Sequence, residues 1–131
     1  MARAVTAPTS ASGGLSPAQA AVDESDAVFS SAAELFGLLA TPIRLKILSS
    51  LCAGEKNVSQ LLREIDTTQP NMSQHLSTLY RAGILARRRD ATQIYYSIAD
   101  PRAASVCRSV CTQIAMDLAE EAPEARGPRA A

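Results

Sequence analysis

The three cysteines are the residues of this chain best suited to covalent or ion-binding chemistry. Cys107 and Cys111 are four residues apart, a spacing that places both thiols on one face of a helix. Cys52 lies far from them in the sequence. In a reducing compartment such thiols act as redox sensors or as ligands of soft ions, and three converging thiolates suit arsenite or antimonite. Inert packing is the third interpretation, because free cysteine is often buried as a small hydrophobic residue.

A second group of side chains suits the recognition of DNA bases. Met72, Leu76 and Leu79 recur at helical spacing and predict a helix with one buried face. The residues expected to face outward are polar but nearly uncharged: Asn71, Ser73, Gln74, His75, Ser77 and Thr78. Such side chains can hydrogen-bond to base edges in the major groove. For His75, a role as an ordinary surface or capping residue is the alternative.

Three consecutive arginines, Arg87, Arg88 and Arg89, end a predicted strand at residues 84–89. A second strand at residues 93–98 follows after a short turn, so the two form a hairpin. We expect Arg88 and Arg89 to contact phosphate at its tip. Arg87 is expected to point elsewhere, because alternate residues of a strand face opposite sides. A solvated strand end is the alternative interpretation of this run.

The elements that would position these residues are mainly helical. Capping and spacing signals predict helices at residues 26–39, from Pro42 to before Gly54, at 58–65, and from about Pro70 to Gly83. A last helix is expected from Pro101 to about residue 121. A helix-turn-helix followed by a hairpin is a winged helix-turn-helix, here of order α-α-α-α-β-β-α. The sequence therefore predicts a mainly α protein with a small β-hairpin that binds double-stranded DNA.

Length and charge fit one DNA-binding domain. The chain has 131 residues and no formal net charge, but residues 41–110 carry ten basic and five acidic side chains. A local basic surface, and not total charge, drives counterion release from DNA. We expect one folded domain at residues 25–121, for DNA binding and dimerisation, between a flexible N-terminal tail (1–24) and a flexible C-terminal tail (122–131).

Other classes of protein are less consistent with these residues. No apolar run has the length of a membrane span and the N-terminal segment lacks a signal-peptide pattern, so we expect a cytoplasmic protein without a membrane partner. No catalytic triad or glycine-rich phosphate loop is recognisable, so we do not expect an enzyme. A winged helix that binds other proteins is an alternative, which salt-sensitive DNA affinity would distinguish.

The chain resembles the ArsR/SmtB family of winged-helix transcriptional regulators over about residues 30–115. The matching pieces are ATPIRLKILSSL, QPNMSQHLSTLYRAGIL and RRRDATQIYYSI. The resemblance implies a homodimer, formed through the first and last helices, that binds an inverted repeat and represses its own promoter until an effector binds. By position, the implied DNA-binding residues are Gln69, Asn71, Ser73, Gln74, His75, Arg88, Arg89 and Gln93.

Two metal sites of that family have no counterpart here. The zinc and nickel site begins Asp-x-His, but Arg102 follows Asp100 at the histidine position. The arsenic and cadmium site uses Cys-x-Cys before the recognition helix, where residues 57–59 contain no cysteine. No cofactor is therefore expected to be required, and a soft metal or metalloid ion is considered only as an effector.

Other members of the family sense persulfide or oxidants with one cysteine in the second helix and one in the last. Cys52 and Cys111 each lie about one turn from those positions, displacements that cancel if the two helices pack antiparallel. The resemblance thus implies effector sensing of sulfane sulfur or an oxidant by Cys52, Cys107 and Cys111. Arsenite, antimonite or another soft metal bound by the same three thiols is the alternative. Arg102 or Arg108 would favour the thiolate.

Overall fold

The computed structural model describes residues 16–17 and 25–130, with side chains described as far as residue 121. Apart from residues 16–17, the expected N-terminal tail lies outside the described residues. The chain divides into two compact units, residues 1–38 and 39–131. The expected domain at residues 25–121 spans parts of both.

The first described helix, α2 (Asp26–Leu39), has the predicted bounds. Its apolar side chains are largely unburied, with Val28, Phe29 and Phe36 all exposed. Within the described residues, no single helix is long and apolar enough to cross a membrane. The consecutive helices α2 and α3 (Pro42–Leu51) reach that length and apolar composition only when both are counted together.

Helix α3 (Pro42–Leu51) begins as its sequence predicts. The hydroxyl of Thr41 accepts a hydrogen bond from the backbone N–H of Arg44 at 3.0 Å, and Pro42 fills the first helical position. Both features satisfy or remove N–H groups that have no partner inside the helix. The apolar side of α3, with Ile47 and Leu48 fully buried, forms one wall of the core.

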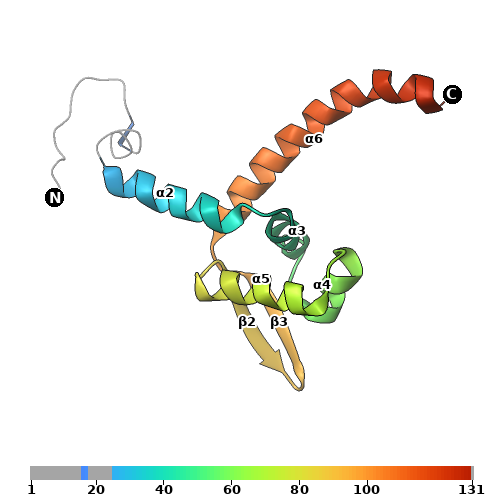
Figure 1. Cartoon of the computed structure of the whole chain (residues 1–131). Helices are drawn as coiled ribbons and strands as arrows, with labels where there is room; N and C mark the ends of the chain where they lie inside the picture. The colour runs from blue at the N-terminus through green and yellow to red at the C-terminus, as the bar shows by residue number, and fades with distance from the viewer. Residues whose placement is uncertain (1–15, 18–24, 131) are drawn as a thin grey trace. The chain divides into compact units, whose positions relative to one another are not determined.

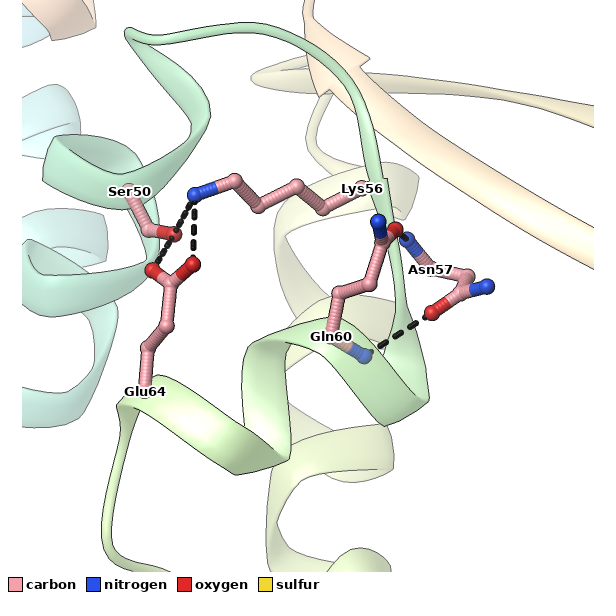
Figure 2. Close-up of polar contacts among 5 residues, drawn as sticks. All are labelled: Ser50, Lys56, Asn57, Gln60 and Glu64. Carbon is pink, nitrogen blue, oxygen red and sulfur yellow. Dashed lines mark hydrogen bonds and ion pairs between the residues drawn. The ribbon is translucent and has the colours of Figure 1, made fainter.

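A two-residue strand, β1 (Lys56–Asn57), precedes α4 (Val58–Glu64) and was not predicted from the sequence. Asn57 and Gln60 form a reciprocal capping box, in which each side chain accepts a hydrogen bond from the other residue's backbone N–H (Figure 2). This cap fixes the start of α4 directly after the strand.

An ion-pair network secures the approach to α4. The ammonium of Lys56 lies 2.7 Å from the carboxylate of Glu64 and donates to the hydroxyl of Ser50 at 2.9 Å (Figure 2). Ser50 also donates to Glu64. Because these residues belong to α3, β1 and α4, the network joins three consecutive elements.

Helix α5 (Gln69–Arg81) is the predicted recognition helix. The hydroxyl of Thr68 caps its N-terminus by accepting from the backbone N–H of Asn71 at 3.2 Å. The helix ends at Arg81, and Gly83 directly after its C-cap residue terminates it with a φ of +81°, a left-handed conformation that favours glycine. The side chains at its buried face are fully enclosed: Met72, Leu76 and Leu79.

Strands β2 (Leu85–Asp90) and β3 (Gln93–Ile98) form the predicted antiparallel hairpin, which extends from the helices in Figure 1. Its turn places Ala91 at a φ of +59°. The strand order β1-β3-β2 makes β3 the centre of a three-stranded sheet. Lys56 pairs with Tyr96 and Asn57 with Tyr95, so β1 adds the third strand.

Helix α6 (Pro101–Ala130) packs against α3 and is longer than predicted (Figure 1). Its backbone is helical through residues 122–130, which we expected to be a flexible tail. Beyond the first turns, α6 exposes large apolar side chains: Val110, Ile114, Met116 and Leu118.

Candidate nucleic-acid interface and thiol cluster

The N-terminal half of α5 exposes the polar side chains that the sequence predicted to read DNA. Gln69, Asn71, Ser73 and Gln74 are all exposed. The amide of Asn71 donates to the hydroxyl of Thr67 at 2.8 Å, so it also braces the start of the helix. The other three extend from a helix whose opposite face is anchored in the core.

His75 is half-buried and has a defined partner. Its Nδ1 accepts a hydrogen bond from Nε of Arg44 on α3, at 3.1 Å. Burial, and then the positive charge of Arg44, lower the pKa of His75 below its ordinary value. The imidazole is therefore neutral near pH 7, and its Nε2 carries the proton that can be donated.

Two residues further along α5 face outward less than predicted. Ser77 and Thr78 are half-buried, whereas Tyr80 and Arg81 beyond them are exposed. Ser77 accepts a hydrogen bond from Arg81 at 2.6 Å. The exposed polar surface of α5 is thus concentrated at residues 69–74, with His75 at its edge.

In the wing, formed by β2 and β3, Arg88 already has acidic partners. Its Nε lies 2.9 Å from Oε1 of Glu55 and its Nη2 contacts Oε2 of the same carboxylate. Its Nη1 lies 3.7 Å from Asp90, and its guanidinium stacks 4.9 Å from the ring centre of Tyr95. Hydrogen bonding by Arg88 lowers the pKa of Glu55. The sequence suggested that Arg88 is free to contact phosphate, but in the structure its side chain is already paired with Glu55 and Asp90.

The neighbouring arginines differ from Arg88. Arg87 lies 4.0 Å over the ring centre of Tyr80 on α5, and hydrogen bonding to Tyr96 raises the pKa of Arg87. Arg87 therefore points away from the tip, as predicted. Arg89 is exposed, and its side chain has no hydrogen bond or ion pair within the described part of the chain. It is the wing arginine most available to a phosphate.

Gln93 connects the wing to the start of α4. Its side-chain oxygen accepts a hydrogen bond from the amide of Asn57 at 3.1 Å, and Asn57 is the N-cap of α4. Arg44, Glu55 and Asn57 were not among the predicted site residues. Each is joined to one of them by a contact between distant parts of the sequence, for which the sequence carries no local signal.

The three cysteines gather where α3 meets α6. The Sγ atoms of Cys107 and Cys111 are 4.0 Å apart, and Cys107 also lies 3.7 Å from the carbonyl oxygen of Leu45. Cys52 is the C-cap residue of α3, and its Sγ accepts a hydrogen bond from Nη1 of Arg108 at 3.8 Å. All three thiols are free. We call these four residues, Cys52, Cys107, Arg108 and Cys111, the thiol cluster.

Burial makes the three thiols unequal. Cys107 is buried, which is the main reason that its pKa rises to about 11, with Cys111 adding to the effect. Cys52 and Cys111 are exposed. Of the two arginines expected near the thiols, only Arg108 contacts one, since Arg102 pairs with Asp100 at 2.8 Å. Among the described residues, no group of three or more His, Cys, Asp or Glu side chains is arranged to hold a metal ion.

Known proteins match the segment that contains this interface. A family model described as "Bacterial regulatory protein, arsR family" matches residues 41–87. The HTH-type transcriptional regulator Rv0081 of Mycobacterium tuberculosis is 38% identical over 98 residues, which cover 72% of this chain and 86% of that protein. This chain belongs to the arsR family.

Solved structures of transcriptional regulators share the fold. The transcriptional repressor BigR from Xylella fastidiosa matches with a TM-score of 0.63 and 32% identity, over 66% of this chain and 89% of that one. Rv0081 matches with a TM-score of 0.61 and 35% identity, over 74% and 98%. This arsR-family chain is therefore a winged helix-turn-helix, DNA-binding transcription regulator. A further relative, a "Probable mercury resistance operon repressor" of Streptomyces lividans, is 38% identical over 56% of this chain and 59% of that protein.

Proposed function

We propose that this regulator is a homodimeric repressor that binds an inverted-repeat operator and releases it when the thiol cluster reacts with sulfane sulfur or an oxidant. The observation that carries the proposal is a pair of contacts where α3 meets α6: Arg108 lies 3.8 Å from the free thiol of Cys52, and the free thiols of Cys107 and Cys111 lie 4.0 Å apart. Both contacts belong to the same folded unit as the recognition helix. The relatives named as repressors support the direction of control.

The proposed DNA contacts follow the exposed polar surface of α5 and the wing. Gln69, Ser73 and Gln74 are exposed and can reach base edges, with Asn71 and the Nε2 proton of His75 beside them. Arg89 is the wing residue assigned to phosphate, and Gln93 flanks it. Arg88 reaches phosphate only by giving up its acidic partners.

The proposed homodimer rests on exposed apolar side chains. Helix α6 exposes Val110, Ile114 and Leu118 at a four-residue spacing, which forms one stripe along the helix. Helix α2 exposes two phenylalanines. Contiguous apolar surface of this kind favours association, and two-fold symmetry would double the DNA contacts and set two half-sites about one helical turn apart.

The chemistry proposed for the thiol cluster begins at an exposed thiolate. Cys52, whose Sγ lies 3.8 Å from Nη1 of Arg108, attacks as the thiolate the terminal sulfur of a persulfide, RS–SH, to give Cys52–S–SH and RS⁻. A second thiolate, from Cys111, then attacks the Cys52 sulfur, forms a Cys52–Cys111 disulfide and expels HS⁻. Two thiols are thereby oxidised and one sulfane sulfur is reduced to sulfide. With a pKa of about 11, Cys107 is a poor nucleophile at neutral pH.

The test measures operator release and protein mass together. The reduced protein is bound to a duplex from the region upstream of its own gene and titrated with glutathione persulfide or peroxide. We expect release with a mass change at Cys52 and Cys111, and retention of DNA by Cys52→Ser and Cys111→Ser. A Ser109→Ala variant is the matched control on α6 and should respond as the unmodified protein does. Release from DNA by either serine variant would contradict the thiol switch.

Soft-ion sensing is the second candidate. It is favoured by the 4.0 Å separation of the Cys107 and Cys111 thiols and by the relative named as a mercury resistance repressor. Its mark would be release by arsenite or Hg²⁺ without oxidation, reversed by a dithiol chelator. That result, with no release by persulfide or peroxide, would replace oxidation by coordination as the proposed mechanism.

A further inference from the structure

Glu55 lies in the turn between α3 and β1 and faces the wing. We infer that Glu55 is a positioning residue for DNA binding, which holds Arg88 away from phosphate and so limits the number of wing arginines that engage DNA. The inference rests on the DNA-binding function of the chain and is independent of the proposed chemistry of the thiol cluster.

Each of the three guanidinium nitrogens of Arg88 lies close to a carboxylate. Nε and Nη2 contact the two carboxylate oxygens of Glu55, while Nη1 lies 3.7 Å from Asp90. Tyr95, the cross-strand partner of Arg88, stacks against the group from the neighbouring strand. A carboxylate bound in this two-pronged way occupies the same donors that would hold a phosphate. Arg88 can therefore bind Glu55 or DNA with that edge, but not both.

The backbone on which Glu55 sits is held in place. The next residue, Lys56, is part of β1 and is bound by Glu64 at 2.7 Å and by Ser50 at 2.9 Å (Figure 2). The carboxylate is thus presented to the wing by an anchored segment, and Arg88 cannot carry it along towards DNA. When Arg88 turns to a phosphate, Glu55 stays behind as an unneutralised negative charge near the DNA.

The ion pair between Arg88 and Glu55 is weak enough for a DNA phosphate to displace Glu55. Both partners are exposed, and exposed ion pairs contribute little to stability because water and salt screen them. A DNA phosphate can therefore displace Glu55, but the exchange lowers the net gain from Arg88. Arg89 has no such competitor within the described residues and binds phosphate at no comparable cost.

The test uses a mixed-sequence duplex, because phosphate contacts act on any sequence, and fluorescence anisotropy over a series of KCl concentrations. Glu55→Gln should bind roughly threefold to tenfold more tightly, with a salt dependence steeper by about one counterion. Glu120→Gln, which removes an exposed carboxylate of α6, is the matched control for net charge and should change affinity less than twofold. An equal gain from both variants would overturn the inference.

A double-mutant cycle separates release of Arg88 from simple removal of a repulsive charge. Arg88→Ala alone should weaken binding only slightly, and Glu55→Gln should gain markedly less affinity in the Arg88→Ala background than alone. Gains of equal size in both backgrounds would show that Glu55 repels DNA without positioning Arg88. The urea midpoint of each variant should match that of the unmodified protein, because the pair is exposed.

Discussion

The cysteines show how position divides the roles of identical side chains. Cys107 is enclosed against the backbone of α3, and burial keeps it protonated, whereas Cys52 is exposed next to the guanidinium of Arg108. The sequence predicted all three as one group, because their types and spacing are all that it shows. The raised pKa of Cys107 depends on the packing of two helices that are distant in sequence.

The raised pKa of Cys107 predicts that the stability of the fold depends on pH. The pKa of Cys107 rises from an ordinary value of 9.0 to about 11 in the folded protein. Above pH 9 the unfolded chain releases this proton first, so the native state loses stability as the pH rises from 9 to 11. Below pH 9 the contribution is fully present. The loss should reach about 2–3 kcal/mol.

Urea unfolding of the reduced protein between about pH 8 and pH 11 measures the effect. Other groups titrate in this range, so the relevant quantity is the difference from Cys107→Ala, in which the decline should be shallower by that amount. Parallel curves for the two proteins would contradict the raised pKa of Cys107 in the folded state.

Helix α5 separates stability from recognition on its two faces. Leu76 is fully buried, whereas Gln74 is exposed two residues earlier. Leu76→Ala should lower the free energy of unfolding by about 2–5 kcal/mol through the cavity that it leaves. Gln74→Ala should change it by less than about 0.5 kcal/mol and instead reduce the preference for operator over mixed-sequence DNA. Denaturation and competition binding measure the two effects.

A loss of stability without a change in preference in Gln74→Ala would place this residue in the core and not at the interface. Asn71 provides a graded comparison, because its amide is partly engaged with Thr67. We expect Asn71→Ala to affect both quantities, since it removes a contact at the start of the helix as well as an exposed amide.

The elements that the sequence predicted are those with local signals. Thr41 with Pro42, and Thr68 with Pro70, mark helix starts that the structure confirms, and Gly83 marks the end of α5. These signals act within a few residues and need no tertiary contact. They were sufficient to predict where these helices begin and end.

What the sequence did not predict depends on partners far along the chain. Strand β1 exists because Lys56 and Asn57 pair with Tyr96 and Tyr95, and two residues carry no period of their own. The pairing of Arg88 with Glu55 likewise joins distant residues, so a run of three arginines looked uniformly available. In the structure, Arg87 stacks on Tyr80, Arg88 is paired with Glu55, and Arg89 is free to contact phosphate.

At the scale of the whole molecule, the exposed apolar stripe of α6 predicts self-association. Val110, Ile114 and Leu118 are 50%, 51% and 58% exposed in a single chain. Ile114→Glu should convert a dimer into monomers and weaken operator binding at least tenfold, because each monomer reads only one half-site. Thr112→Glu, an exposed position on another side of α6, is the control and should leave the dimer intact.

Sedimentation equilibrium measures the association and anisotropy measures operator binding in the same variants. A protein that is monomeric before either substitution, or an Ile114→Glu variant that still sediments as a dimer, would exclude this stripe as the interface.

The apolar stripe of α6 also affects how repression depends on the number of copies in a cell. When copies must pair before they occupy an operator, occupancy at low abundance rises with the square of the monomer concentration. Halving the abundance then lowers occupancy roughly fourfold instead of twofold. Three exposed side chains on one helix would thus set a threshold of synthesis, below which the operator stays open whatever the state of the cysteines.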